Sequence, residues 1–264
     1  MHANSYNKEM EITSIATISG KTDSIAFLQR QAGVGFLPIS FGYARISTQT
    51  EELSILQVLN TYNFSRSRES SLVQMENGIM LGAFFGSKFL ICVEPTTKAG
   101  NFESLIFDEP KIYELHYKVR FLTNGLRKNN IETIFATFED NLIREFKIDI
   151  LQSKIVFLQI FNLVMNPHRI VHCKKHDLIL VQEPQKETSE KERIILIHAS
   201  LNTYYTPIIF KEEEIACWAS DQYRILFANN IRKVVRDYSL SKSETEAMEK
   251  HWHGTNSLNS LPLI

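Results

Sequence analysis

The sequence predicts an all-β, propeller-like protein of about five irregular blades. Three observations favour this class. Short apolar runs follow one another in pairs between residues 12 and 240, turn-forming residues join the two runs of a pair, and no convincing long helix separates the pairs. The composition agrees, because the 264 residues include 17 Phe and 9 Tyr, which favour strands, but only 10 Gly and 7 Pro.

The first two clear pairs are predicted to be hairpins. In "GIMLGAFFGSKFLICVEP", residues 78 to 95, two apolar runs flank a Gly-containing turn at 86 to 88. In "IFATFEDNLIREFKIDI", residues 134 to 150, the runs flank the acidic and amide residues at 139 to 141. Such residues reverse the chain readily, so each stretch reads as two antiparallel strands.

The later runs continue the pattern to residue 240. Strands are predicted at 154 to 161, 168 to 173, 177 to 184, 193 to 201, 204 to 210, 214 to 220, 223 to 228 and 231 to 240. The charged segment "QKETSEKE" between the third and fourth of these runs is predicted to be an exposed loop.

One segment leaves helix and strand open. In "TQTEELSILQVLNTYN", residues 48 to 63, Thr48 and Glu51 have the spacing of a capping box, and leucines recur every three residues. The core of the same segment, "LSILQVL", also fits a strand. The polar stretch "NFSRSRESS" that follows, residues 63 to 71, is predicted to be an exposed loop whose serines are open to phosphorylation.

The pairs recur at intervals typical of propeller blades. "AFFGS" begins at 83, "ATFED" at 136, "LILVQEP" at 178 and "CWASD" at 217, which gives separations of 53, 42 and 39 residues. Blades of the WD type recur every ~40 to 45 residues, because a single four-stranded sheet cannot bury both of its faces and must stack against neighbours.

One of these recurring pairs, at residues 134 to 150, resembles part of a WD repeat. "IFATFEDNLIREFKIDI" is similar to the second and third strands of that repeat, with Asp140 near the family's turn aspartate and Phe146-Lys147 where Trp-Asp would stand. The Gly-His and Trp-Asp dipeptides of the family are absent, so the resemblance implies architecture only. A β-sandwich or open barrel is the alternative fold, since it needs a similar number of strands.

The domain organisation is predicted to be one body with two tails. Residues 1-10 are polar and read as a flexible N-terminal tail, residues 11-240 form the propeller-like domain, and residues 241-264 form a C-terminal tail. Trp252, Leu258, Leu261 and Leu263 keep this second tail partly apolar, so it is predicted to dock on a partner protein.

Composition and charge narrow the functional classes. A net charge of −1 argues against a polyanion or a membrane surface as the default partner, and no run approaches the roughly 18 to 20 apolar residues of a membrane span. Three separated cysteines do not form a disulfide framework, which favours a reducing compartment. The expected location is therefore the cytoplasm or the nucleus.

The sequence contains no catalytic signature, and no cofactor or metal is predicted. His168, His172, Cys173 and His176 are metal-ligating residue types, but four-residue steps along a strand separate their side chains by ~13 Å. The short tail sequence "HWHG" lacks the rigid surroundings that a metal site needs.

Acidic residues also recur where strands end. Asp108, Asp140, Asp177 and Asp221 are interpreted as turn-formers, although carboxylates at the axis of a five-bladed propeller can hydrolyse glycosides.

The expected function is a non-catalytic scaffold for protein-protein interaction, a subunit of a multisubunit intracellular complex. One alternative is a glycoside or other hydrolase with axial carboxylates. The other is a nucleic-acid-binding subunit, in which Arg232, Lys233 and Arg236 of "NNIRKVVRD" would contact the phosphates.

Overall fold

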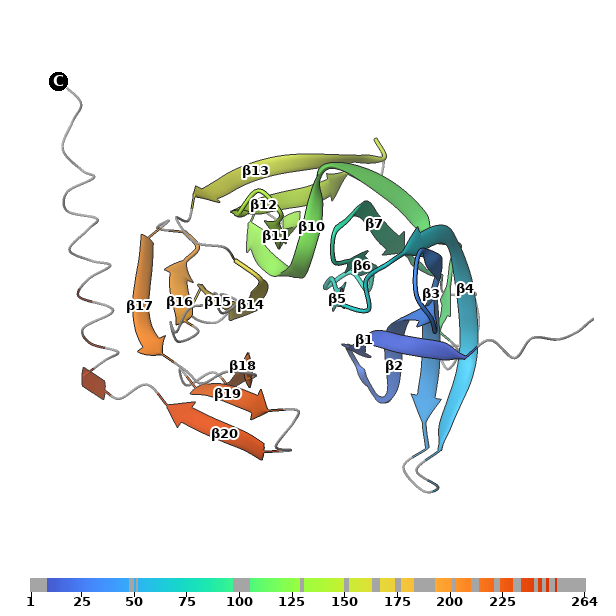
Figure 1. Ribbon diagram of the computed structural model, residues 1–264, viewed down its shortest axis with the longest axis horizontal. Helices are drawn as coiled ribbons and strands as arrows, with labels where there is room; N and C mark the ends of the chain where they lie inside the picture. The colour runs from blue at the N-terminus through green and yellow to red at the C-terminus, as the bar shows by residue number, and fades with distance from the viewer. Residues whose placement is uncertain are drawn as a thin grey trace, which may run out of the picture.

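The computed structural model consists of antiparallel sheets arranged around a central axis like the blades of a propeller (Figure 1). The structure describes residues 9–47, 50, 52–96, 105–128, 131–149, 152–162, 167–173, 177–182, 193–200, 203–209, 214–220, 224–229, 234–239, 242, 243, 246 and 250. The all-β, propeller-like prediction is therefore confirmed, in preference to the sandwich or open barrel.

Among the described strands, five blades can be distinguished. Blade 1 contains β1 (Met10–Ile18), β2 (Lys21–Gln31), β3 (Leu37–Ile46) and β4 (Leu53–Ser65). Blade 2 contains β5 (Ser70–Gln74), β6 (Met80–Phe84), β7 (Ser87–Val93) and the first part of β10 (Lys111–Lys128). Blade 3 contains the second part of β10 with β11 (Ile131–Phe138), β12 (Leu142–Asp149) and β13 (Lys154–Asn162).

The remaining blades come from the second half of the chain. Blade 4 contains β14 (Arg169–Cys173), β15 (Leu178–Gln182), β16 (Arg193–His198) and β17 (Thr203–Ile209). Blade 5 has three described strands, β18 (Glu214–Ser220), β19 (Arg224–Asn229) and β20 (Val234–Ser239). A small ribbon of β8 (Pro95–Thr96) and β9 (Ile106–Phe107) lies between β7 and β10. Among the described strands, none pairs the sheet of blade 1 with that of blade 5.

The strand β10 belongs to two blades. Its residues 111 to 114 pair with β7, and its residues 119 to 128 pair with β11, so a single strand is the outermost of blade 2 and the innermost of blade 3. Figure 1 shows β10 (green) curving from one blade to the other. The two blades consequently form one continuous seven-stranded sheet.

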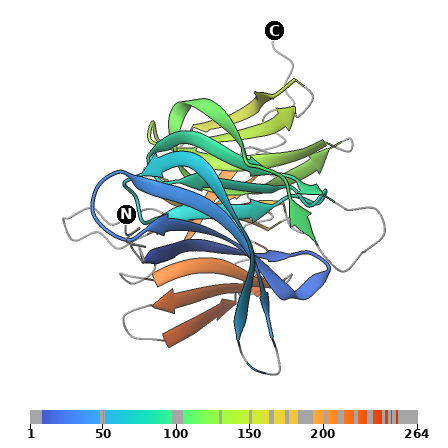
Figure 2. The ribbon, with the colours of Figure 1, turned by 90° about the vertical axis from the view of Figure 1, so that its right-hand side faces the viewer.

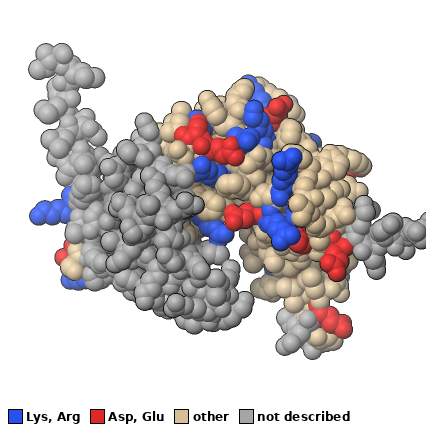
Figure 3. Space-filling model, viewed as in Figure 1, with Lys and Arg blue, Asp and Glu red and all other residues tan. Residues whose placement is uncertain are grey.

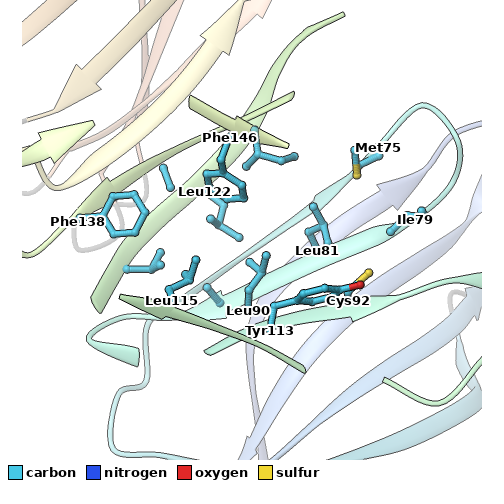
Figure 4. Close-up of a cluster of buried hydrophobic side chains, with 14 residues drawn as sticks. Met75, Ile79, Leu81, Leu90, Cys92, Tyr113, Leu115, Leu122, Phe138 and Phe146 are labelled. Atoms are coloured by element: carbon cyan, nitrogen blue, oxygen red, sulfur yellow. The ribbon is translucent and has the colours of Figure 1, made fainter. Parts of the chain in front are cut away.

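Apolar clusters between neighbouring blades form the core. Phe41, Tyr43 and Phe84 belong to the cluster between blades 1 and 2. Leu81, Leu90 and other residues fill the space between blades 2 and 3 (Figure 4). A third cluster lies between blades 3 and 4. Because the inner strands are covered on both faces, β6 and β15 are buried along their whole length.

The predicted hairpins are confirmed by the strand pairing. Strands β6 and β7 pair around Gly86, whose φ of 74° is one that glycine adopts without strain. Strands β11 and β12 pair around Asn141, which has a φ of 65°. The alignment of "CWASD" was wrong by one strand, because "AFFGS", "ATFED" and "LILVQEP" fall on the second strand of their blades, whereas "CWASD" falls on β18, the first strand of blade 5.

The segment forms the strand β4, which pairs with β3 from Leu53 to Ser65 with two register shifts, so the open choice between helix and strand is settled. The prediction of an exposed loop over 63 to 71 was wrong for most of that stretch, because β4 extends to Ser65 and β5 begins at Ser70. Ser65, Ser70 and Ser71 are buried.

Hydrogen bonds explain this burial. The Ser70 hydroxyl lies 2.6 Å from the Thr13 hydroxyl and donates to Ser14 Oγ, and Ser71 Oγ accepts from the Leu122 amide.

Candidate partner-binding surface

The outermost strand of blade 1, β4, presents an unusual edge. Its 13 residues, "LSILQVLNTYNFS", contain no charged residue and no proline. Each of the other described outer strands contains a charged residue or a proline, for example Lys154 in β13, Pro207 in β17 and Arg236 in β20. Because charges and prolines normally prevent an edge strand from pairing with another chain, β4 lacks this protection.

The side chains of β4 are also apolar and accessible. Six of its large apolar side chains are exposed by 45% or more, namely Leu53 at 45%, Ile55 at 58%, Leu56 at 51%, Val58 at 46%, Tyr62 at 83% and Phe64 at 58%. Among the described strands, β4 pairs only with β3. Its other edge therefore offers backbone groups to an added strand next to apolar side chains. Figure 2 shows the long strands of blade 1 (blue to cyan) crossing the front of the molecule.

Aromatic residues continue this surface at one end of the blade. In the loop between β2 and β3, Val34 is 97% exposed and Phe36 is 63% exposed. The Arg66 guanidinium lies over the Phe36 ring, 4.1 Å from its centroid. Exposed aromatic side chains and arginine are the types that contribute most to binding energy in protein interfaces.

A buried arginine holds this end of the blade in place. The Arg30 side chain is 1% exposed and donates to Glu11, to the Gly33 carbonyl and to the Arg66 carbonyl. It thereby connects β1 to the two loops that carry Phe36 and Arg66. These loops are fixed by the fold before any partner binds.

The face of blade 1 directed away from blade 2 is apolar at its rim. Ile15 and Val58 lie in one cross-strand row with Phe27 and Gly42. Phe27 is fully buried and lies so close to Gly42 that a Cβ on the glycine would come within 2.1 Å of the ring. Ile12 and Ile15 remain 47% and 58% exposed. The exposed apolar area of the blade thus extends from β4 to β1.

A histidine joins three blades at the end of the axis where the innermost strands begin, here called the upper end. His168 Nε2 lies 3.4 Å from a Glu69 carboxylate oxygen, and the imidazole contacts the rings of Phe85 and Phe121 at 5.5 Å. The hydrogen bond to His168 lowers the pKa of Glu69. These contacts indicate that His168 has a structural role and does not bind a metal.

Two other histidines surround Asp177 at the opposite, lower end of blade 4. His172 Nε2 and His198 Nδ1 lie 3.6 Å and 3.5 Å from its carboxylate oxygens, and the Ser200 amide donates to it at 2.9 Å. Burial raises the pKa of Asp177, but the interactions with His172 and Ser200 outweigh burial and leave that pKa below its usual value. His176 lies outside the described residues.

No metal-binding arrangement is present in the described part of the chain, where no three His, Cys, Asp or Glu side chains are placed to hold an ion. Two of the three cysteines, Cys92 and Cys173, are described, and both are buried free thiols.

The turn aspartates do not converge on one site among the described residues. Asp140 lies in the β11–β12 turn at the upper end, where it accepts from the Leu142 amide and forms two hydrogen bonds with Arg144. Asp177 lies at the lower end, and Asp108 bonds Thr96 near the β8–β9 ribbon. Asp221 lies outside the described residues. Asp140 therefore has the turn-forming contact that the sequence interpretation expected, whereas the side-chain contact of Asp108 is with Thr96.

Several predicted binding residues fall outside the described structure. Trp252, Leu258, Leu261 and Leu263 of the tail do so, as do Arg232 and Lys233. Arg236 belongs to β20, where its backbone pairs with Phe227. On the face shown in Figure 3, the acidic and basic side chains of the described residues are interspersed. Among the described residues, no helix is long and apolar enough to cross a membrane.

The surface of β4 was missed by sequence reasoning. A signal was available, because the segment lacks charge over its whole length, but this signal has meaning only once the segment is known to be an outer strand.

The fold and its exposed edge place the chain in the class of all-β, propeller-like proteins. No family model matches the chain, and no curated protein matches it. Similarity is found with solved structures. Sqt1 from Chaetomium thermophilum superposes with a TM-score of 0.57 at 10% identity, covering 89% of this chain and 63% of that one.

Two further structures are similar. Chaetomium thermophilum Sqt1 bound to the N-terminus of the ribosomal protein L10 gives a TM-score of 0.56 at 11% identity, over 88% of this chain and 64% of that one. A putative 6-phosphogluconolactonase from Bacteroides uniformis gives a TM-score of 0.49 at 10% identity, over 87% of this chain and 81% of that one. The chain thus spans less than two thirds of the Sqt1 structures, and the likeness to them concerns the fold.

Proposed function

We propose that the chain is a non-catalytic scaffold, a subunit of a multisubunit complex, and that it binds a partner protein along the edge of β4. The observation that carries this proposal is the long, uncharged and apolar edge of β4 with one free side among the described strands. A partner strand added there would gain main-chain hydrogen bonds, while Ile55 and Val58 would bury apolar surface.

Three further features support the proposal. The aromatic and arginine residues beside β4 provide anchors of the kind found in protein interfaces. The turn position of Asp140 supports an assignment of the blades as degenerate WD repeats. The free thiols of Cys92 and Cys173 fit a reducing compartment, either the cytoplasm or the nucleus.

The test is a comparison of captured proteins between matched variants. Ile55→Lys combined with Val58→Lys should reduce the recovery of the specific partners at least about tenfold, because two charges on an edge strand oppose the burial of that edge. Leu158→Lys is the control, since Leu158 is 49% exposed on β13, the outer strand of another blade. Purification under gentle lysis followed by mass spectrometry measures recovery.

The proposal would be overturned if the unmodified chain, the double β4 variant and Leu158→Lys all recovered the same partners in equal amounts. A fourth protein that lacks residues 241-264 tests the predicted docking tail separately. Loss of partners on this deletion with full recovery on the β4 variant would assign binding to Trp252, Leu258, Leu261 and Leu263 instead of to β4.

A further inference from the structure

Opposite charges stand at the two ends of the edge of β4. Glu52 immediately precedes the strand and Arg66 immediately follows it, whereas the 13 residues between them carry no charge. Both of these charged residues are exposed. The edge is therefore negative where the strand begins and positive where it ends.

Neither charge is neutralised by the described residues of its own chain. The Glu52 carboxylate forms no ion pair with any of them, and neither does the Arg66 guanidinium, which lies over the ring of Phe36. Only their backbones are tied to the blade, because the Glu52 carbonyl accepts from the Ser47 amide at 2.8 Å and the Arg66 carbonyl accepts from Arg30 at 3.3 Å. Both charged groups are thus held at the ends of the edge and remain available to a partner.

A second copy of the same edge matches this order of charges. When identical edge strands of two chains pair antiparallel, a two-fold axis relates the chains, and the start of each strand meets the end of the other. With the axis near Leu59, the residue midway between the two charges, Glu52 of each copy would lie beside Arg66 of the other. A single docking event would therefore form two ion pairs, one at each end of the shared edge.

The uncharged part of the edge is also complementary to itself. Its first half exposes the aliphatic side chains of Ile55 and Leu56, and its second half exposes the aromatic side chains of Tyr62 and Phe64. Antiparallel pairing of two copies sets the aliphatic half of one against the aromatic half of the other, and cross-strand pairs of these types stabilise a sheet. A net charge of −1 on each chain adds little repulsion between the copies.

We propose that β4 pairs antiparallel with β4 of a second copy of this chain, so that the two four-stranded sheets of blade 1 become one continuous sheet across a two-fold axis. The approach is open, because β4 lies at the rim of the ring in Figure 1 and ends its sheet among the described strands. This inference rests on the proposed role of β4 in binding and names the partner.

The test is sedimentation velocity of the purified full chain over a range of concentrations. The unmodified chain should change from monomer to dimer as its concentration rises to about 100 µM. Glu52→Arg and Arg66→Glu should each weaken the dimer at least about tenfold, because each change replaces two attractions in the dimer by two repulsions.

Mixing the two variants separates a lost ion pair from a damaged fold. An equimolar mixture of Glu52→Arg and Arg66→Glu should recover dimers that contain one chain of each kind, because every introduced charge then faces an opposite charge. Glu114→Arg is the matched control, since Glu114 is an exposed glutamate on β10, the outer strand of blade 2, and this variant should dimerise like the unmodified chain.

Three results would contradict the inference: a chain that stays monomeric at about 100 µM, a dimer that neither charge reversal weakens, and a mixture of the two variants that stays monomeric. The double variant Ile55→Lys and Val58→Lys then decides the proposed function separately. If this variant loses the proteins captured under gentle lysis, β4 binds a different protein and the proposed function stands. If capture is unchanged, the proposed function fails together with the inference.

Discussion

At the scale of single residues, Asp140 and Arg144 show how one of the blade turns is held in place. Arg144 is 5% exposed and lies over the rings of Tyr117 and Phe138, at 4.1 and 4.9 Å from their centroids. Its guanidinium holds both carboxylate oxygens of Asp140. The turn between β11 and β12 is therefore fixed by an ion pair packed between aromatic rings.

A pH dependence of stability follows from this pair. The hydrogen bond from Arg144 lowers the pKa of Asp140 in the folded state below its ordinary value of 3.8. Asp140 thus contributes stability above pH 3.8, and the contribution is lost as pH falls through the lower, folded-state pKa. Urea unfolding should show a smaller loss of stability between about pH 5 and 2 for Asp140→Asn than for the unmodified chain.

The control for this measurement is Glu139→Gln, because Glu139 forms a half-exposed pair with Lys118 that contributes little. Identical pH profiles for the unmodified chain and Asp140→Asn would show that the pair does not stabilise the turn.

At the scale of elements, the segment between β4 and β5 shows why buried serines cannot serve as modification sites in the folded chain. Ser70 is buried and bonded to Thr13 and Ser14, whereas Ser67 lies in the connecting loop and is only partly covered. A phosphate needs solvent or basic partners, and the Ser70 site provides hydroxyl groups instead.

Two acidic substitutions test this difference. Ser70→Glu should destabilise the protein by about 2 to 4 kcal/mol, because it buries a charge without a partner, and Ser67→Glu by less than about 0.5 kcal/mol. Chemical denaturation measures both. Equal effects of the two substitutions would show that the β4–β5 connection opens readily in solution.

Elements differ in how well the sequence predicts them. The hairpins around Gly86 and Asn141 were predictable because local turn chemistry determines them. The strand β4 was not predictable from its own sequence, because leucines three residues apart also fit a helix. Only the pairing with β3 selects the strand.

Sites depend on contacts that no local pattern contains. At the lower end of blade 4, Asp177 lies between His172 and His198, which belong to the different strands β14 and β16. Asp140, by contrast, was predictable as a turn-former, since a single short segment defines its role.

At the scale of the whole molecule, the blades are not equivalent. Blade 1 consists entirely of strands from the N-terminal part of the chain, and blade 5 has three described strands from the C-terminal part. Within the described residues, no strand is shared between these two sheets. The apolar rim of blade 1 and the edge of β4 are consequently accessible to another protein.

The continuous strand β10 has a consequence for the way the molecule opens. Most neighbouring blades of this chain are joined by loops, which allow one blade to lose its structure while the next keeps it. Blades 2 and 3 have no such loop between them, because the continuous strand β10 pairs with β7 through its first part and with β11 through its second part. They should form one cooperative unit of local unfolding.

Native-state hydrogen exchange can detect this unit. Amides of Leu90 in β7 and Phe135 in β11 should report opening free energies within about 1 kcal/mol of each other, and amides in β4 should exchange through a separate, easier opening. A difference of more than about 3 kcal/mol between the opening free energies of β7 and β11 would show that β10 unfolds locally between the parts that pair with these two strands. Otherwise blades 2 and 3 respond to heat, denaturant or pulling as a single body, and the edge that we propose for partner binding belongs to the part that yields first.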